Sequence, residues 1–179
     1  MSVRKPLPGL AKALTAIALL WAIGIPAGAT TKTANDNLTM KIANACVANN
    51  ATVSFPQYLP NSPTAVTAAG NGASIACNVN DSWSIKASTG GNPTHASGTC
   101  GAATCTRAMA DGAGHYIGYE LFIGACCSGT TVWGTTAGHL ITGTGDGTAQ
   151  AIAFWGMVAA SQNVPAGTYT DTVVATYTF

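Results

Sequence analysis

Cysteine is the residue type with the clearest chemistry in this 179-residue chain, at positions 46, 77, 100, 105, 126 and 127. An even number of cysteines in an exported chain is typical of a disulfide framework, and the leader described below predicts export. We favour a Cys46–Cys77 bridge, which would close a long loop and stabilise the fold by about 3 to 4 kcal/mol in the loop-entropy model. Cys100 and Cys105 would form a local clip.

The adjacent Cys126 and Cys127 leave two alternatives open, a bridge between neighbours or a pairing elsewhere. Metal binding by the cysteines is disfavoured, because their spacing lacks paired CxxC ligands and an exported chain lies in an oxidising compartment. The sequence therefore predicts disulfides, with no metal and no cofactor.

Hydrolytic chemistry finds little support in the order of the remaining polar residues. No spacing links a histidine (His95, His115 or His139) to a nucleophile and an orienting carboxylate, as a catalytic triad requires. Ser128 lacks the GxSxG frame of a nucleophile elbow. Residues 143–147, Gly-Thr-Gly-Asp-Gly, have neither the lysine of a phosphate-binding loop nor the acidic ladder of an EF-hand, so we interpret them as a turn.

Four carboxylates are candidate acids for glycoside hydrolysis: Asp111, Glu120, Asp146 and Asp171. The sequence does not place any two of them at the separation that this reaction needs. Asp171 is better interpreted as a hydrogen-bonding group at the start of a strand. We therefore expect a protein that is not an enzyme.

Composition excludes further classes of function. Only 7% of residues are charged, against about 25% in ordinary soluble domains. A net charge of +1 gives no basic field that would attract nucleic acid or anionic lipid. Sparse charge with abundant glycine and threonine is typical of a β-rich extracellular protein.

The first 29 residues have the organisation of a secretory signal peptide. Arg4, Lys5 and Lys12 form a basic region, residues 13–25 are apolar, and residues 27–29, Ala-Gly-Ala, match a cleavage site. The apolar run is short for a membrane span, although a retained anchor helix is the alternative. No later stretch is apolar enough to span a membrane, so we expect no span after signal removal.

The last residues, 167–179, alternate as a half-buried strand does. One face carries Val173, Ala175, Tyr177 and Phe179, and the other carries Thr172, Val174, Thr176 and Thr178. An apolar strand at the edge of a sheet invites pairing with another chain. This strand therefore requires a partner on each side.

A second alternating segment precedes Cys46, where the apolar Leu38, Met40 and Ile42 are separated by polar residues. It predicts either the first strand of this domain or a strand with another destination. Between the two ends the pattern predicts short strands and no amphipathic helix, with a glycine-rich loop at residues 88–106. The expected strands cover residues 51–55, 73–79, 83–87, 116–123, 130–133, 139–142 and 149–155, which favours an all-β, immunoglobulin-like sandwich.

Several short motifs occur in an order and spacing that resemble the spore coat protein U domain family, which includes the major pilins of archaic chaperone-usher pili in Gram-negative bacteria. Beside the two terminal strands, the matching segments are residues 75–77, 107–109, 119–122, 132–134, 154–156 with Ala159, and 166–173. Cys126 and Cys127 stand where relatives more often have a charged turn. This difference leaves open whether the subunit belongs to a fibre shaft or a fibre tip.

The resemblance implies an incomplete immunoglobulin-like β-sandwich that is completed by donor-strand exchange. Residues 30–45 would be the donor-strand extension and residues 46–179 the sandwich. The donor residues Leu38, Met40 and Ile42 of one subunit would enter a groove in the next subunit, beside the acceptor residues Val173, Ala175, Tyr177 and Phe179.

The implied partners are a periplasmic pilus chaperone, an outer-membrane usher, and copies of this chain and related pilins in a homopolymer. The implied product is a secreted surface fibre that supports adhesion or biofilm formation, reached through the periplasm. The alternatives are a secreted spore or cell coat protein, and a carbohydrate-binding adhesive module whose ligand stacks on Trp133, Trp155, Tyr116 or Tyr119.

Overall fold

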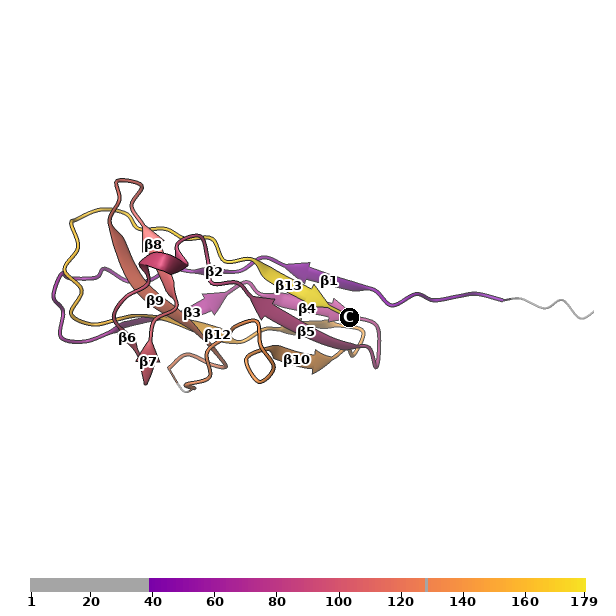
Figure 1. The fold of residues 1–179 in the computed structure, drawn as a ribbon. Coiled ribbons are helices and arrows are strands. Elements are labelled where there is room, and N and C mark those ends of the chain that lie inside the picture. Colours follow the sequence, from indigo (N-terminus) through magenta and orange to yellow (C-terminus); the bar gives the residue numbers. More distant parts are fainter. Residues whose placement is uncertain (1–38, 128) are drawn as a thin grey trace, which may run out of the picture. The chain divides into compact units, whose positions relative to one another are not determined.

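A computed structural model describes residues 39–127 and 129–179. By its contacts the chain divides into two units, Met1–Met40 and Lys41–Phe179. The larger unit is all-β, with a single turn of 3-10 helix, η1 (Pro93–His95) (Figure 1). None of the helices in the described ranges is long and apolar enough to cross a membrane.

The largest sheet has five strands in the order β2-β3-β12-β9-β8. Its central pair is β9 (Tyr116–Ile123) and β12 (Phe154–Val158), which run antiparallel with Gly156 opposite Leu121. β8 (Arg107–Ala110) flanks β9, while β3 (Val66–Asn71) and then β2 (Thr52–Val53) flank β12. β12 pairs with β3 on one side and β9 on the other, so this sheet joins segments that are far apart in the chain.

Two three-stranded sheets complete the sandwich. One has the order β1-β4-β11, formed by β1 (Cys46–Asn49), β4 (Ser74–Cys77) and β11 (Ala149–Ala151). The other has the order β10-β5-β13, formed by β10 (Ile141–Thr144), β5 (Ser82–Ala87) and β13 (Ala175–Thr178). A small hairpin of β6 (Thr99–Cys100) and β7 (Ala103–Thr104) stands apart from them.

The main hydrophobic core follows from the two-residue period of these strands. β5 buries every second residue, Trp83, Ile85 and Ala87, and leaves Ser82 and Lys86 exposed. These side chains pack with others from β4, β9 and β12, among them Ile75, Leu121 and Phe154. A second, smaller cluster comprises Cys100, Cys105, Phe122, Trp155 and Ala159. The larger sheet is therefore apolar on both faces.

The structure corrects several strand boundaries. The expected strand over residues 149–155 is two strands, because β11 pairs with β4 while β12 pairs with β9 and β3. Residues 130–133 supply only an isolated bridge between Val132 and Phe122. β3 was not expected, since its small residues carry a weak pattern and become a strand through pairing on both sides.

The C-terminal strand is also shorter than predicted. Residues 169–174 contain one isolated bridge, Thr170 with Ala110, before β13 begins at Ala175. The described part of the N-terminal segment, residues 39–45, is not assigned as strand. The rest of that segment, including Leu38, lies outside the described residues, as does the expected signal peptide.

Candidate functional site

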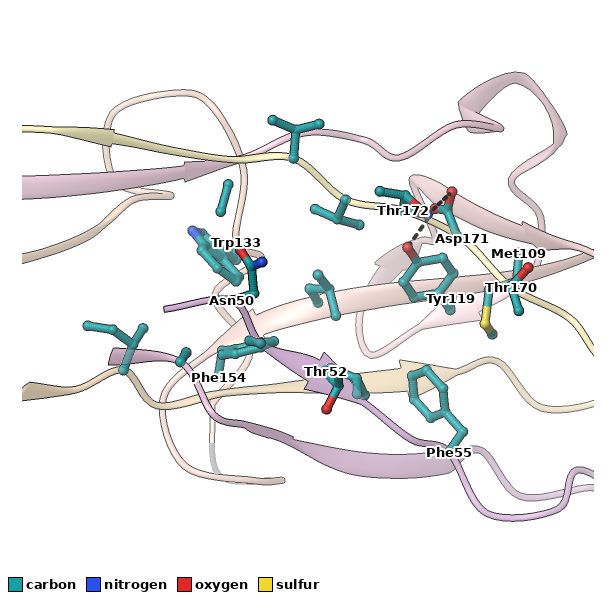
Figure 2. Close-up of a pocket in the computed structure, with 18 of the residues that line it drawn as sticks. Asn50, Thr52, Phe55, Met109, Tyr119, Trp133, Phe154, Thr170, Asp171 and Thr172 are labelled. Carbon is teal, nitrogen blue, oxygen red and sulfur yellow. Dashed lines mark hydrogen bonds between the residues drawn. The ribbon is translucent and has the colours of Figure 1, made fainter. Parts of the chain in front are cut away.

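An apolar groove of about 640 Å³ lies beside the C-terminal segment (Figure 2). One wall is formed by residues 169–175 and Tyr177, and the opposite wall by residues 50–53 and Phe55. Between the walls lie side chains of the main core: Met109, Tyr119, Leu121, Trp133, Ile152 and Phe154. The groove therefore opens directly onto the hydrophobic core.

The C-terminal wall alternates as its sequence does. Val173, Ala175 and Tyr177 are half-buried and line the groove, while Thr172, Thr176 and Thr178 are exposed. Phe179 is 52% exposed and lines a separate hollow with Trp83 and Gly143. The structure thus brings three of the four proposed acceptor residues to the groove and places the fourth elsewhere.

The backbone of this wall is hydrogen-bonded to a neighbouring strand along one edge only. β13 pairs with β5, and Val174, just before it, accepts a hydrogen bond from the Ser88 N–H. Backbone N–H and C=O groups point alternately to opposite sides of a strand, so those of Val173, Ala175 and Tyr177 point away from β5. Within the described residues no strand pairs with that second edge of β13. Open backbone groups therefore face the groove.

The opposite wall contains β2 and the two residues before it, which follow directly after β1. In the described part of the chain β1 pairs only with β4, and β2 only with β3. An extended segment placed in the groove would meet an unpaired edge on each side. In the described residues, the groove is thus bordered by β2 and β13, each of which has one edge without a strand partner.

Asp171 fixes one end of the C-terminal wall. Its carboxylate accepts hydrogen bonds from the N–H groups of Gly91 and Thr172, at 2.8 Å each, and from the hydroxyl of Tyr119 at 2.7 Å. Burial, and then the hydrogen bond to Asp171, raise the pKa of Tyr119 well above its usual range. Tyr119 therefore stays a hydrogen-bond donor, and Asp171 has the structural role expected of it.

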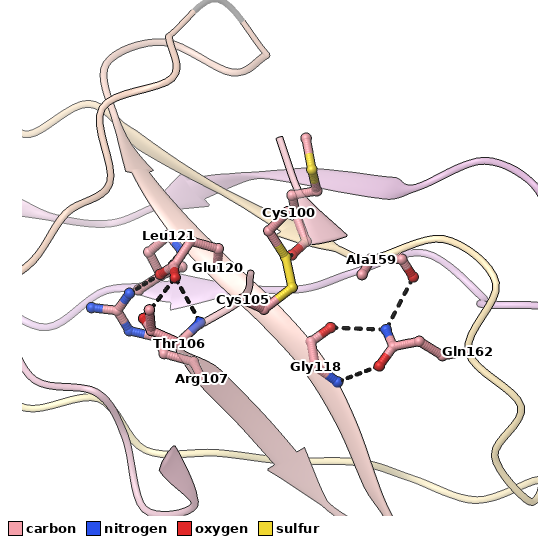
Figure 3. The surroundings of a disulfide bond; sticks show 10 residues. Cys100, Cys105, Thr106, Arg107, Gly118, Glu120, Leu121, Ala159 and Gln162 are labelled. Atoms are coloured by element: carbon pink, nitrogen blue, oxygen red, sulfur yellow. Dashed lines mark hydrogen bonds and ion pairs between the residues drawn. A yellow bond between two sulfur atoms is a disulfide. The ribbon is translucent and has the colours of Figure 1, made fainter. Parts of the chain in front are cut away.

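Arg107 and Glu120 form a buried ion pair, and each side chain is only 1% exposed (Figure 3). Arg107 also donates to the carbonyl oxygens of Ser88, at 3.0 Å, and Trp133, at 2.6 Å. Glu120 accepts from the backbone N–H and the hydroxyl of Thr106. Both charges are thus compensated, and the pair joins β8 and β9 to the segment that follows β5.

Three disulfides join the six cysteines. Cys46 pairs with Cys77 across β1 and β4, and Cys100 pairs with Cys105 at the β6–β7 hairpin, where Figure 3 shows the bond. Cys126 pairs with Cys127, which decides the alternative that the sequence left open. In the described residues no group of three or more His, Cys, Asp or Glu side chains is placed to hold a metal ion.

The residues considered for catalysis are scattered in roles of their own. His115 Nδ1 lies 2.6 Å from Asp111 Oδ2, and this hydrogen bond lowers the pKa of Asp111 to about 2. His95 stacks on Tyr116, and His139 Nδ1 lies 2.9 Å from the Val132 carbonyl oxygen. Asp146 accepts from the N–H and hydroxyl of Thr148, as a turn residue does. Ser128 lies outside the described residues.

The aromatic residues considered for stacking on a carbohydrate have little free surface. Trp133, Trp155 and Tyr119 are buried, and Tyr116 is already stacked on His95. Trp133 Nε1 donates to the Ile85 carbonyl oxygen, so that its polar atom is also used internally. These four residues pack within the sandwich or against it.

The two residues of the expected donor segment that the structure describes, Met40 and Ile42, are exposed, unlike these aromatic residues. Met40 is 83% exposed and Ile42 is 75% exposed. Neither side chain belongs to a core cluster of this chain. Both apolar side chains are therefore left in solvent in the single chain.

Sequence reasoning missed the wall at residues 50–55 and the role of Ser88. Residues 50–55 belong to a short apolar segment without a groove signature, and Ser88 is one serine among many. Arg107 carried a detectable signal, because an arginine within the apolar run Arg107–Ala110 must find a partner if that strand is buried.

The fold and the groove define a class, an all-β, immunoglobulin-like sandwich with an open-edged apolar groove. The Spore Coat Protein U domain model matches residues 32–176, and the chain belongs to that family. Protein U of Myxococcus xanthus is 35% identical over 175 residues, which cover 93% of this chain and 95% of the relative.

A solved structure supports the fold. It is the crystal structure of a CsuC–CsuE chaperone–tip adhesion subunit pre-assembly complex from archaic chaperone-usher Csu pili of Acinetobacter baumannii. The match has a TM-score of 0.52 at 21% sequence identity and covers 77% of this chain. It spans 40% of the chain to which it was matched. At this identity the likeness bears on the fold alone.

Proposed function

We propose that this protein is a structural subunit of a secreted surface fibre, assembled by strand exchange along a chaperone-usher pathway. Residues 1–29 are removed on export, and residues 30–45 act as the donor extension of one copy. Leu38, Met40 and Ile42 of that copy enter the groove of the next and take the place of the missing strand.

The observation that carries this proposal is the apolar groove beside the open edge of β13. An entering strand supplies backbone partners for the outward N–H and C=O groups of Ala175 and Tyr177. Each apolar donor side chain that becomes buried contributes about 1.5 to 3 kcal/mol, and each backbone hydrogen bond about 0.5 to 1.5 kcal/mol. A three-residue donor is therefore sufficient for a stable contact.

Strand exchange of this kind produces a fibre. The donor and acceptor surfaces differ, so the contact is head-to-tail and does not close into a dimer. A periplasmic chaperone first fills the groove and keeps the subunit soluble, an outer-membrane usher exports it, and copies of this chain and related pilins extend the fibre. Adhesion or biofilm formation is the role that such a fibre would serve at the cell surface.

The comparisons support this proposal. The matched structure contains a pilus subunit with its chaperone. A subunit of this kind performs no catalysis. This agrees with the separate structural roles of Asp111, Asp146 and Asp171.

A secreted spore or cell coat protein is the second candidate, and the name of the family favours it. The same groove and donor would build a coat if assembly took place over a surface rather than through an usher. Electron microscopy of the assembled material separates thin fibres from a continuous layer.

The test is size-exclusion chromatography with light scattering on the mature protein, produced with and without a periplasmic pilus chaperone. Three chains are compared: wild type, a triple substitution of Leu38, Met40 and Ile42 by serine, and a matched triple substitution of Asn37, Thr39 and Lys41 by serine. The first triple variant removes the apolar donor face, and the second changes the polar face over the same length.

We expect a one-to-one complex with chaperone for all three chains. On chaperone release, heat-resistant multimers should form from wild type and from the polar-face variant, but not from the apolar-face variant. A wild-type chain that remains a stable monomer without any partner would refute strand exchange.

A further inference from the structure

The corner that follows β5, residues 88–91, holds the C-terminal wall of the groove at Val174. The Ser88 N–H donates to the Val174 carbonyl oxygen at 3.0 Å, and the Val174 N–H donates to Ser88 Oγ at 2.9 Å. Ser88 Oγ also accepts a hydrogen bond from the Gly90 N–H, at 3.3 Å. Both backbone groups of Val174 are therefore engaged by a single serine.

This contact sets the direction of the neighbouring backbone groups. Because the backbone alternates, holding the N–H and C=O of Val174 toward Ser88 turns those of Val173 and Ala175 toward the groove. The same alternation begins at Thr170, whose N–H and C=O both bond to Ala110, at 2.9 Å each. Residues 171–174 are not assigned as strand, so the hydrogen bonds from Ser88 take the place of regular strand pairing at Val174.

Asp171 provides a second attachment to the same corner. Its carboxylate accepts from the Gly91 N–H and from the Tyr119 hydroxyl, which joins the corner, the wall and β9. Gly90 has φ +79° and lies against this carboxylate, so that a Cβ at position 90 would collide with it. The corner and the wall are fitted closely to each other.

Arg107 also holds this corner, through a hydrogen bond to the backbone of Ser88. Its guanidinium donates to the Ser88 carbonyl oxygen at 3.0 Å while it is paired with buried Glu120. The corner is thereby attached to β8 and β9 as well as to β5. It does not depend on the groove being filled.

We propose that Ser88 and Asp171 are positioning residues of the groove, which hold residues 171–174 extended in the empty subunit so that Val173 and Ala175 present their backbone groups to an incoming strand. This inference rests on the proposed function. Its physical basis is preorganisation: a wall that is already extended does not have to be ordered at the moment of binding, so binding is faster.

The test measures how fast the mature chain takes up a fluorescently labelled synthetic peptide of residues 34–44, by fluorescence anisotropy over a range of excess peptide concentrations. The variants are Ser88→Ala and Asp171→Ala, with Ser88→Thr as the conservative variant that keeps the hydroxyl. Asp146→Ala is the matched control, since the Asp146 carboxylate also accepts hydrogen bonds, from the N–H and hydroxyl of Thr148, but does not line the groove. Chemical unfolding of each variant is measured in parallel.

For wild type, Ser88→Thr and Asp146→Ala, we expect an uptake rate that rises in proportion to peptide concentration. For Ser88→Ala and Asp171→Ala we expect a rate about tenfold lower at low peptide, which corresponds to about 1.4 kcal/mol, and a plateau at high peptide. The plateau reports a slow ordering step before binding, which a loss of overall stability does not produce.

The experiment distinguishes a failure of the proposed function from a failure of the positioning role. Wild type that binds no peptide overturns the proposed function itself. Wild type that binds, with Ser88→Ala giving the same rates and no plateau, overturns the positioning role alone. If Asp171→Ala does not fold, Tyr119→Phe replaces it in the test, because this variant removes only the hydrogen bond from the Tyr119 hydroxyl to Asp171. A slower uptake with a plateau supports the positioning role, and wild-type rates overturn it.

Discussion

At the scale of the residue, Arg107 shows how one side chain can bind several segments together. Its side chain is buried and pairs with Glu120. It also donates hydrogen bonds to two backbone carbonyl oxygens, that of Ser88, which follows β5, and that of Trp133. A buried charge is tolerated when it is paired with an opposite charge and hydrogen-bonded. The sandwich is therefore sensitive to this position although it lines no groove.

We expect Arg107→Met to lower the free energy of unfolding by about 3 to 5 kcal/mol, because it leaves Glu120 buried and unpaired. The double variant Arg107→Met with Glu120→Gln should cost less than the two single changes summed, since the partners are coupled. Urea unfolding followed by tryptophan fluorescence measures all of these. Lys86→Met, at an exposed position of β5, is the control and should change stability by less than about 0.5 kcal/mol.

Asp111 and His115 give the protein a dependence on acid pH. The pKa of Asp111 in the folded state is about 2, lowered from 3.8, first by the hydrogen bond from His115. A carboxyl whose pKa is lower in the folded state stabilises the fold above its ordinary pKa and loses that contribution as the pH falls toward the lower value. The contribution of Asp111 to the stability of the fold is therefore lost as the pH falls from about 3.8 to about 2.

For Asp111→Asn we expect a lower thermal midpoint than wild type above pH 3.8, with a difference that shrinks as the pH falls toward about 2. Thermal unfolding followed by circular dichroism across this range measures the effect. His115→Ala should show the same convergence, because it removes the largest cause of the lowered pKa. A difference that stays constant with pH would contradict this role of Asp111.

At the scale of the element, the C-terminal wall has two functional sides within one segment. Val173 points to the groove and is half-buried, whereas its neighbour Val174 is 61% exposed. The two valines are adjacent residues with the same side chain, and they differ in how far that side chain is exposed. They therefore offer a matched test of the groove.

Val173→Lys should abolish multimer formation on chaperone release, because it places an unpaired charge where a donor side chain would be buried. Val174→Lys should leave multimers unchanged, since its side chain is already exposed to solvent. Light scattering measures assembly, and circular dichroism checks that both variants are folded. Equal assembly by the two variants would exclude Val173 from the contact.

Elements also show where pattern reasoning succeeds and fails. β9 was predicted with the bounds that the structure gives it, Tyr116–Ile123, because a long and mostly apolar run is a strong local signal for a buried strand. β11 and β12 were merged, because the two residues between them leave the apolar pattern unbroken while pairing sends the strands to different sheets. Pairing partners are set by contacts distant in sequence, which a local period does not contain.

At the scale of the whole molecule, sparse charge makes trypsin a selective probe of assembly. Outside the proposed signal peptide, residues 1–29, the basic cleavage sites are Lys32, Lys41, Lys86 and Arg107. Lys86 lies within β5 and Arg107 is buried, whereas Lys41 is exposed. Lys41 also lies between the proposed donor residues Met40 and Ile42.

We expect trypsin to cut the chaperone-free monomer at Lys41 and to leave Lys41 intact in heat-resistant multimers, because a strand held in a groove does not fit a protease active site. Mass spectrometry of timed digests identifies the cut. The variant with serine at positions 38, 40 and 42 is the control and should stay cleavable under assembly conditions. Equal cleavage of monomer and multimer would place Lys41 outside the contact.

The sequence by itself determined what depends on composition and on local period. It predicted the all-β class, the alternation of Val173, Ala175 and Tyr177, and the family, because these follow from residue type and order along the chain. It also favoured the pairings Cys46–Cys77 and Cys100–Cys105, which the structure contains.

Only the tertiary structure decided which segments meet. It brought residues 50–55 opposite the C-terminal wall, directed Arg107 to the carbonyl oxygens of Ser88 and Trp133, and moved Phe179 away from the groove. The physical reason is that a groove is a property of two edges and the core between them. Its shape depends on strand pairing across the whole sandwich, which no single stretch of sequence encodes.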